Sequence, residues 1–147
     1  GEKDWQQLQV VTRMAKDLSM PVEVVGCPIV RDLDGVALSS RNVYLSPEQR
    51  EAAPVIQTAL KAGLATIRAG ERNPAAVEEL MAGIVEAEPL AELDYAVVRR
   101  ADTLEVVDPL EGDLRLLAVA RFGTTRLLDN VGMHVALASG GAHAAAP

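Results

Sequence analysis

The sequence is poor in aromatic residues and carries no excess of basic ones. Aromatic side chains make up 3% of its 147 residues, whereas proteins that bind single-stranded nucleic acid stack bases on aromatic rings beside basic groups. Its 14 Lys and Arg residues are outnumbered by 21 Asp and Glu residues, which gives a net charge of −7. No cluster of Lys and Arg suggests a track for a phosphate backbone. These shortages argue against nucleic acid as a partner.

The chain has a single cysteine, Cys27, so no internal disulfide can form, and no Cys/His spacing typical of a metal site is present. Cys27 follows an apolar run between Gly26 and Pro28, which favours a small buried hydrophobic residue over a reactive thiol. No apolar run approaches the ~18 residues of a membrane span, and no signal-peptide pattern is found. We therefore expect a cytoplasmic protein without a membrane partner.

Familiar catalytic motifs are also lacking, since the sequence contains no P-loop, no G-x-G-x-x-G and no nucleophile elbow. His134 and His143 are far apart in the sequence and are interpreted as incidental. Acidic pairs such as Asp32 and Asp34 are typical of turns and solvated helix faces. Any chemistry must therefore come from loops that bind and position a ligand.

What the chain does contain begins with the pattern of a helix followed by a short strand. A helix is predicted from Asp4 to about Met20, ended by Pro21, because apolar residues repeat at helical spacing (Leu8, Val11, Ala15, Leu18). The β-branched run Val22–Gly26 predicts a strand covered on both faces. Helix and strand together are half of a β-α-β unit, and Gly1 stands where the preceding strand would end. We expect that strand to be missing because the chain was cut there.

The middle of the chain carries turn and helix-start signals. Asp34-Gly35 predicts a tight turn between two short extended segments. Ser46, Pro47 and Gln49 form a capping-box pattern that starts a helix, and Pro54 predicts a kink or restart near Ala53. Gly70 suits the end of this helix, and Asn73-Pro74 starts the next one, whose apolar residues again repeat at helical spacing.

From Leu93 onward the apolar period changes to that of strands. Four β-rich runs separated by polar turns are predicted, at residues 93–100, 104–108, 114–123 and 125–135. Consecutive strands without intervening helices imply an antiparallel sheet, which we expect to pack against the two preceding helices as an α+β domain. The tail from about residue 137 has no periodicity and is expected to fray.

Two loops carry residues suited to binding a nucleotide. In the first, Gly1 permits close backbone approach, Lys3 offers charge to a phosphate and Asp4 can accept from ribose hydroxyls, with Gln7 one turn further on. The alternative is that Asp4 only caps the helix and Lys3 is solvated. In the second, the hydroxyls of Ser39 and Ser40 and the guanidinium that follows them form a short anion clamp. The alternative there is a plain polar turn.

The order and spacing of the two loops resemble the pantothenate synthetase (pantoate–β-alanine ligase) family. The matching segments are GEKD-x-x-Q, P-x-V-R, DG-x-A-L-S-S-R-N-x-Y-L, LDYAVVRRADTL and RLLAVARFGTTRLLDN, so the resemblance covers nearly the whole chain. It implies that residues 1–28 end a Rossmann-like α/β nucleotidyltransferase domain and that residues 29–147 form a small α+β lid domain of helices on an antiparallel sheet. The family's first half, with its histidine-containing H-x-G-H motif, is not in this chain.

The resemblance further implies an ATP-dependent, adenylate-forming ligase of pantothenate biosynthesis, with ATP and Mg²⁺ as cofactors. Pantoate and ATP would give pantoyl adenylate and pyrophosphate, and β-alanine would then give pantothenate and AMP. By the resemblance, the ATP contacts would be Gly1, Glu2, Lys3, Asp4, Val30, Leu38, Ser39, Ser40 and Arg41. Of these, Lys3, Ser39, Ser40 and Arg41 would act in catalysis, and Gln7 would hold pantoate.

Because the H-x-G-H motif of the family's first half is not in this chain, the active site would be incomplete. We therefore expect the chain alone to be inactive and activity only in the parent enzyme. A homodimer, or association with the N-terminal half, is expected because Leu8, Val22, Val24 and Val25 would otherwise lack a packing partner. The alternative function is a non-catalytic oligomerising or binding module derived from the same enzyme.

Overall fold

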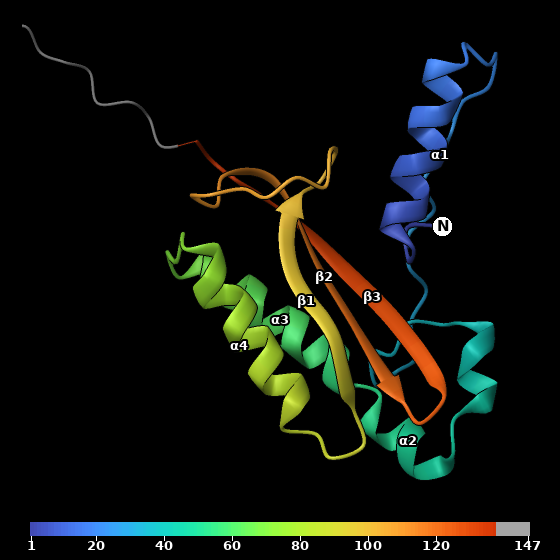
Figure 1. Ribbon diagram of the computed structural model, residues 1–147, viewed down its shortest axis with the longest axis vertical. Coiled ribbons are helices and arrows are strands. Elements are labelled where there is room, and N and C mark those ends of the chain that lie inside the picture. Colours follow the sequence, from blue (N-terminus) through green and yellow to red (C-terminus); the bar gives the residue numbers. More distant parts are fainter. Residues whose placement is uncertain (138–147) are drawn as a thin grey trace, which may run out of the picture.

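Two helices cover one face of a three-stranded antiparallel sheet in the computed structural model, which describes residues 1–137 (Figure 1). The sheet has the order β1-β2-β3, formed by Glu92–Arg100, Gly112–Phe122 and Thr125–Val135. The covering helices are α3 (Val55–Arg68) and α4 (Pro74–Glu86). The prediction of an antiparallel sheet packed on two helices is therefore confirmed.

The core lies between these helices and the sheet and is built almost entirely from aliphatic residues. Phe122 is its one fully buried aromatic side chain among the described residues. The other large, fully buried core side chains come from the helices, the sheet and the connection between β1 and β2 (Leu60, Ile67, Met81, Leu110, Leu114, Leu116). Strand pairing along β2 and the burial of these side chains hold the layer together.

The helix starts follow their local signals. Ser46 and Gln49 form the predicted capping box at the start of α2 (Pro47–Ala52). Pro54, which has no N–H to donate, separates α2 from α3, as expected. Asn73 caps α4 by accepting a hydrogen bond from the N–H of Ala75.

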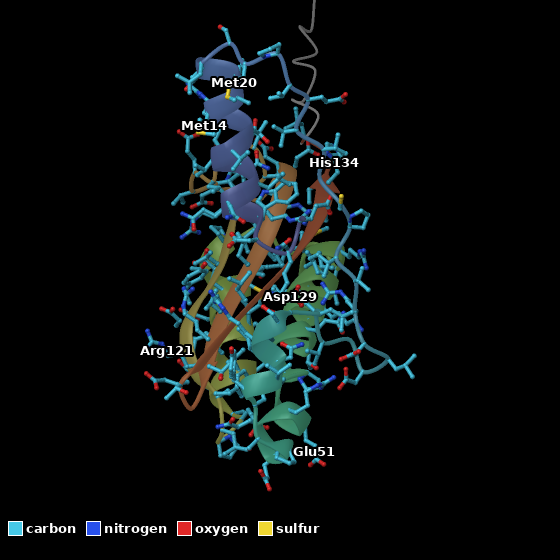
Figure 2. All side chains as sticks on the ribbon, turned by 90° about the vertical axis from the view of Figure 1, so that its right-hand side faces the viewer. Met14, Met20, Glu51, Arg121, Asp129 and His134 are labelled. Carbon is cyan, nitrogen blue, oxygen red and sulfur yellow. The ribbon has the colours of Figure 1, made fainter. Side chains whose placement is uncertain are left out.

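Helix α1 (Trp5–Asp17) stands apart from the helix-and-sheet layer (Figure 1). It ends three residues before the predicted limit, and of its side chains only Ala15 is buried. After α1, residues 18–28 run back along the helix toward Gly1. We call residues 5–28 the N-terminal arm. Figure 2 shows Met14 and Met20 near the end of the arm that is remote from the sheet.

Two predictions about the arm are wrong. Val22–Gly26 forms no strand, because a buried parallel strand needs neighbours to complete its ladder and no described segment pairs with it. Cys27, expected to be buried, is exposed in the same stretch. A backbone hydrogen bond from the N–H of Glu2 to the carbonyl of Cys27 (2.8 Å) holds the segment beside the Gly1–Asp4 loop.

The expected strand at residues 104–108 is also absent, and the sheet has three strands rather than four. Side chains of Val107 and Leu110 are buried in the core, so the apolar residues of this run pack without joining the ladder. Its backbone bonds go elsewhere, with Arg100 donating to the carbonyl of Glu105 and Leu110 to that of Arg72.

The turn predicted at Asp34-Gly35 is confirmed as a small hairpin, with a single β-bridge between Arg31 and Ala37. Gly35 has φ +93°, a left-handed conformation that favours glycine. The 3₁₀ helix η1 (Ser40–Tyr44) follows and leads to α2. No helix within residues 1–137 is long and apolar enough to cross a membrane. The predicted tail and His143 lie outside the described residues, apart from Leu137.

Candidate functional site

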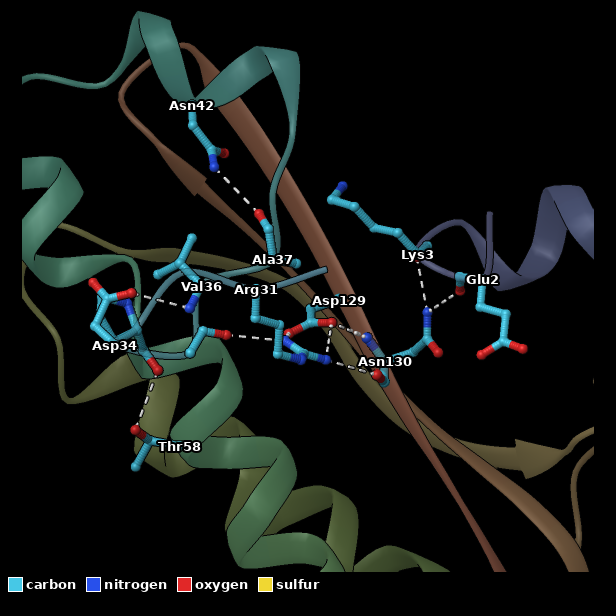
Figure 3. Close-up of polar contacts among 12 residues, drawn as sticks. Glu2, Lys3, Arg31, Asp34, Val36, Ala37, Asn42, Thr58, Asp129 and Asn130 are labelled. Carbon is cyan, nitrogen blue, oxygen red and sulfur yellow. Dashed lines mark hydrogen bonds and ion pairs between the residues drawn. The ribbon is translucent and has the colours of Figure 1, made fainter. Parts of the chain in front are cut away.

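The Gly1–Asp4 loop is fastened to the sheet through its backbone. The side-chain amide of Asn130, on β3, donates hydrogen bonds to the carbonyl oxygens of Glu2 (2.9 Å) and Lys3 (2.8 Å) (Figure 3). Asn130 is 2% exposed, so these bonds are shielded from water. The loop therefore has a defined position at the edge of the sheet. Because only its backbone is used for this attachment, the Lys3 side chain makes none of these bonds.

The first loop also caps α1. The Asp4 carboxylate accepts a hydrogen bond from the N–H of Gln7 (3.1 Å), the N-cap arrangement named above as the simpler alternative for this residue. A cap uses one carboxylate oxygen, so the other is left for a ligand. The Gln7 side chain is exposed on the first turn of α1, and Gly1 is exposed at the start of the chain.

The second loop starts from the hairpin. The N–H of Leu38 donates to the carbonyl of Val30 (2.8 Å), which places these two residues opposite each other at the open end. Both side chains are largely exposed, at 65% for Val30 and 47% for Leu38. Two aliphatic side chains left beside each other in water form a small apolar surface of the kind on which a flat ring can pack.

Ser39 organises the residues that follow. Its hydroxyl accepts a hydrogen bond from the N–H of Arg41 (3.3 Å) and so caps η1. Ser40 and the Arg41 side chain are exposed, and the Arg41 guanidinium touches the protein through one bond to the carbonyl of Arg126 (3.4 Å). Most of its N–H groups are thus available to an anion.

Folding brings Lys3 close to this second loop. Lys3 lines one small cavity with Ala37 and Asn42, and in Figure 3 its side chain runs from the first loop toward them. Burial lowers the pKa of Lys3 below its ordinary value; Asp129 opposes this shift, whereas the charge of Arg41 adds to it. The cavity places Lys3 beside Ala37 and Asn42, the two residues that flank the Leu38–Arg41 loop.

Asp129 anchors the hairpin from β3. Its carboxylate accepts two hydrogen bonds from Arg31, at 2.5 and 2.9 Å, and is 5% exposed (Figure 3). Arg50 of α2 holds the other side of the turn through Asp32 and Asp34, and its hydrogen bond lowers the pKa of Asp34. The hairpin that carries the second loop is therefore braced on two sides.

Arg115 of β2 supports the first loop from below. Its Nε donates to Asn130 Oδ1 (2.6 Å), its guanidinium lies over the Trp5 ring, and one nitrogen lies 3.8 Å from the Glu2 carboxylate. Burial lowers the pKa of Arg115, while the carboxylates of Glu2 and Asp129 raise it. Gly132 leaves room for this guanidinium, since a Cβ there would lie 2.6 Å from it.

Two adjoining pockets connect the loops. One is bordered by Lys3, Asp4 and Trp5, the other by Arg41 and Tyr44, and Arg126 borders both. Arg126 is itself paired with Asp94 (2.7 Å). Because Arg126 borders both, we call the two pockets together the groove; Lys3 borders one of them and Arg41 the other.

Sequence reasoning missed the residues of the sheet that build this site, namely Arg115, Arg126, Asp129 and Asn130. All four stand in the RLLAVARFGTTRLLDN segment, but no local spacing distinguishes them from other strand residues. Conversely, His134 pairs with Asp113 (2.8 Å) on an exposed part of the sheet, and neither residue lines the two pockets.

Among residues 1–137, no group of three or more His, Cys, Asp or Glu side chains could hold a metal ion. Asp129 is engaged by Arg31, and Asp4 caps α1. A protein cage for a divalent cation therefore does not fit the carboxylates of this groove. Mg²⁺ is commonly held by one or two carboxylates together with substrate phosphates, so it would have to enter on a ligand that carries them.

Comparisons with known proteins identify the family of the chain. The family model described as pantoate-beta-alanine ligase matches residues 1–132. Pantothenate synthetase 1 of Frankia alni is 49% identical over 144 residues, which cover 92% of this chain and 49% of that protein. Pantothenate synthetase of Desulfitobacterium hafniense is 46% identical over 130 residues, covering 88% of this chain and 46% of the relative.

Among solved structures, the crystal structure of pantothenate synthetase from Thermus thermophilus superimposes with a TM-score of 0.85 at 44% identity. It covers 89% of this chain, and this chain covers 47% of it. The chain thus spans about half the length of the relatives it matches. On the match over residues 1–132, the chain belongs to the pantoate–β-alanine ligase family.

Proposed function

We propose that this chain supplies one wall of the active site of an ATP-dependent ligase that joins pantoate to β-alanine through a pantoyl adenylate. In this proposal, residues 1–28 end the nucleotide-binding domain and residues 29–147 form the lid domain. The Gly1–Asp4 loop and the Leu38–Arg41 loop together receive ATP. The observation that carries the proposal is that Lys3 of the first loop lines one cavity with Ala37 and Asn42, which flank the second loop.

Two cations held in one groove repel each other, and this repulsion adds to the lowering of the Lys3 pKa that burial causes. A polyanion between them would relieve the repulsion and gain from both charges. The triphosphate of ATP has the required charge. The half-buried Lys3 is a point charge, whereas the exposed guanidinium of Arg41 can close on phosphate oxygens from the opposite side.

The remaining predicted contacts fit around this phosphate site. Val30 and Leu38 would lie against the adenine, because their exposed side chains stand beside each other next to the second loop. Glu2, Ser39 and Ser40 would add contacts to the nucleotide, and Gln7 would hold pantoate. The backbone at Gly1 would pass close to the ligand without a side chain in the way.

The chemistry would proceed in two transfers. A pantoate carboxylate oxygen attacks the α-phosphorus, and the bond from that phosphorus to the bridging oxygen breaks, releasing pyrophosphate. The amine of β-alanine then attacks the acyl carbon, loses a proton, and AMP leaves with the electron pair of the cleaved C–O bond. Lys3 and Arg41 would stabilise the charge that develops on the phosphates, so their role is positioning and electrostatic stabilisation.

The test is a complementation assay. The 147-residue chain is mixed with a protein that corresponds to the other half of a relative, such as the Frankia alni synthetase, and given ATP, Mg²⁺, pantoate and β-alanine. We expect no pyrophosphate release from the chain alone and pantothenate formation in the mixture, because each wall acts through geometry fixed around the same phosphates. Pantothenate formed by the chain alone would contradict the two-wall proposal, and a mixture without activity would contradict the assignment of this wall.

A second candidate function is a binding or oligomerising module without catalysis. The observation that favours it is the apolar surface of the N-terminal arm, where Val10, Leu18 and Val25 are 59%, 67% and 67% exposed. Apolar side chains gathered on one segment favour association with another protein or another copy. ATP binding separates the two candidates, because a module of this kind has no need of the cationic groove.

A further inference from the structure

Asn130 satisfies its buried amide completely and does so with the first loop. Its Nδ2 group donates to the carbonyls of Glu2 and Lys3, at 2.9 and 2.8 Å, and its Oδ1 accepts from Arg115 at 2.6 Å. Both N–H groups and one oxygen lone pair are therefore in use. A carboxylate of the same shape could accept from Arg115 but would face two carbonyl oxygens with no proton to offer. The contacts require an amide at this position.

The preceding residue holds the other loop. Side chains of successive strand residues point to opposite faces, so Asp129 reaches the hairpin while Asn130 reaches the first loop. Arg31 donates to both oxygens of Asp129 and also to the carbonyl of Gly35 (3.0 Å), which fixes the turn of the hairpin. Leu38 bonds to Val30 on the same hairpin, so the base of the Leu38–Arg41 loop is set by Asp129.

The strand that carries both residues explains how two distant segments meet there. β3 is an edge strand, so one side of its ladder is free for loops to approach. On its other side, Asp129 pairs with Ala118 and Asn130 with Leu117, in the middle of a continuous ladder. Asp129 and Asn130 are therefore fixed in the sheet by strand pairing, and each forms hydrogen bonds with one of two loops that are distant in the sequence.

We propose that Asp129 and Asn130 are positioning residues that together set the separation between Lys3 and the Leu38–Arg41 loop, and with it the width of the groove. Both residues line the pocket beside Lys3, and their side-chain hydrogen bonds are made to protein: Asn130 acts through the Lys3 backbone and Asp129 through Arg31. The identity of the ligand rests on the proposed function. The positioning itself is a property of the unliganded chain.

The test uses Asn130→Asp in the 147-residue chain, with Asn73→Asp as the matched control. Both substitutions change an amide to a carboxylate. Asn73 is the N-cap of α4, where Asp is as good a cap as Asn, and lies outside the groove. Trp5 is the only tryptophan of the chain and lies under Arg115 beside the first loop, so its fluorescence reports on this loop alone.

Without nucleotide, Asn130→Asp is expected to speed the amide exchange of residues 2–5 by about tenfold or more and to raise acrylamide quenching of Trp5, because the loop loses both bonds to its anchor. Exchange in α3 and α4 stays unchanged. In titrations with MgATP followed by Trp5 fluorescence, the Kd rises about tenfold. Asp129→Asn raises the same Kd and speeds exchange in residues 31–38 instead of residues 2–5.

The proposal is overturned if Asn130→Asp and Asn73→Asp show the same amide exchange in residues 2–5 and the same affinity for ATP. Should α3 lose its protection in Asn130→Asp, Asn130→Ala decides by the same two readouts, since it removes the bonds without adding a charge. If the wild-type chain shows no binding of MgATP, the proposed function is contradicted, whereas the positioning role is not. Amide exchange in the unliganded variants then decides whether Asp129 and Asn130 hold the two loops.

Discussion

The guanidinium of Arg115 lies over the indole of Trp5, with its Cζ 3.6 Å from the ring centroid. The indole N–H donates to the carbonyl of Ala101 (2.7 Å), so the start of α1 is held to both β2 and the end of β1. This pair joins the arm to the sheet directly below the first loop. Loss of the Arg115–Trp5 contact would therefore affect both the stability of the fold and the position of the first loop.

Arg115→Met is expected to lower the free energy of unfolding by about 1–3 kcal/mol, because it leaves Asn130 Oδ1 without its donor and removes the cation from the Trp5 ring. Urea denaturation followed by circular dichroism measures the change. Arg121→Met is the control, since Arg121 is exposed on the same strand (Figure 2), and a change within about 0.5 kcal/mol is expected there. Equal losses in the two variants would contradict the role given to Arg115.

Arg41→Ala is expected to remove about 2–4 kcal/mol of transition-state stabilisation in the complementation assay, as the loss of an oxyanion donor does. The effect should fall on pyrophosphate release more than on the β-alanine step, because the proposed function assigns the guanidinium to the phosphates. Arg68→Ala, at the exposed end of α3, serves as the control. Unchanged pyrophosphate release in Arg41→Ala would return Ser39–Arg41 to a plain polar turn.

The pKa of Lys3 is expected to respond in opposite directions to its two charged neighbours. Burial lowers it below 10.5 and Arg41 lowers it further, whereas Asp129 raises it. Arg41→Gln should therefore raise the pKa and Asp129→Asn should lower it. The pH dependence of Lys3 acylation, mapped by mass spectrometry with the exposed Lys16 as reference for reagent reactivity, measures both shifts. Shifts of the same sign in both variants would contradict the opposite effects of Asp129 and Arg41 on Lys3.

The same lowered pKa has a consequence for stability. Between the folded pKa of Lys3 and 10.5, the unfolded chain binds more protons at this residue than the folded chain does. The contribution of Lys3 to the free energy of unfolding therefore increases as the pH rises through this window, and below it the buried charge costs stability in full. Lys3→Met should remove this increase from the pH profile measured by urea denaturation.

Gly35→Ala is expected to destabilise the chain by about 1–3 kcal/mol, because the left-handed backbone is unfavourable for alanine and the new methyl group would overlap the side chain of Gln57. Gly70→Ala separates the two causes. Gly70 has φ +113° with no atom within 4 Å of an added Cβ, so it reports the backbone strain without the overlap. Thermal unfolding of both variants gives the difference, and an equal loss would exclude the overlap as a cause.

The exposed arm predicts association of the chain. In sedimentation velocity we expect a dimer for the 147-residue chain, since Val10, Leu18 and Val25 gain from leaving water. Val10→Lys together with Leu18→Lys should shift the chain to the monomer. Adding the other half of a relative should compete with self-association if both use the same face. A wild-type monomer at all concentrations would count against both forms of association.

Signals that act over a few residues predicted much of this fold. Ser46 with Gln49, the break at Pro54 and the cap at Asn73 were all readable, because each depends on hydrogen bonds within one turn of the chain. The alternation of apolar residues likewise predicted β1, β2 and β3. Val22–Gly26 and residues 104–108 have the same β-rich composition yet form no strand, since a strand exists only where a neighbour supplies its partners.

The candidate site divides along the same line. Residue types in the two loops indicated Lys3 and Ser39–Arg41 as groups for an anion, because charge and hydroxyl content are properties of the side chains themselves. That Lys3 lies beside the second loop, and that Asp129 and Asn130 anchor the two loops, depends on contacts between residues far apart in the chain. No spacing within a strand distinguishes an aspartate that binds a distant arginine from one that faces solvent. Such partners are chosen by the packing of β3 against both loops, and they become visible only once the chain has folded.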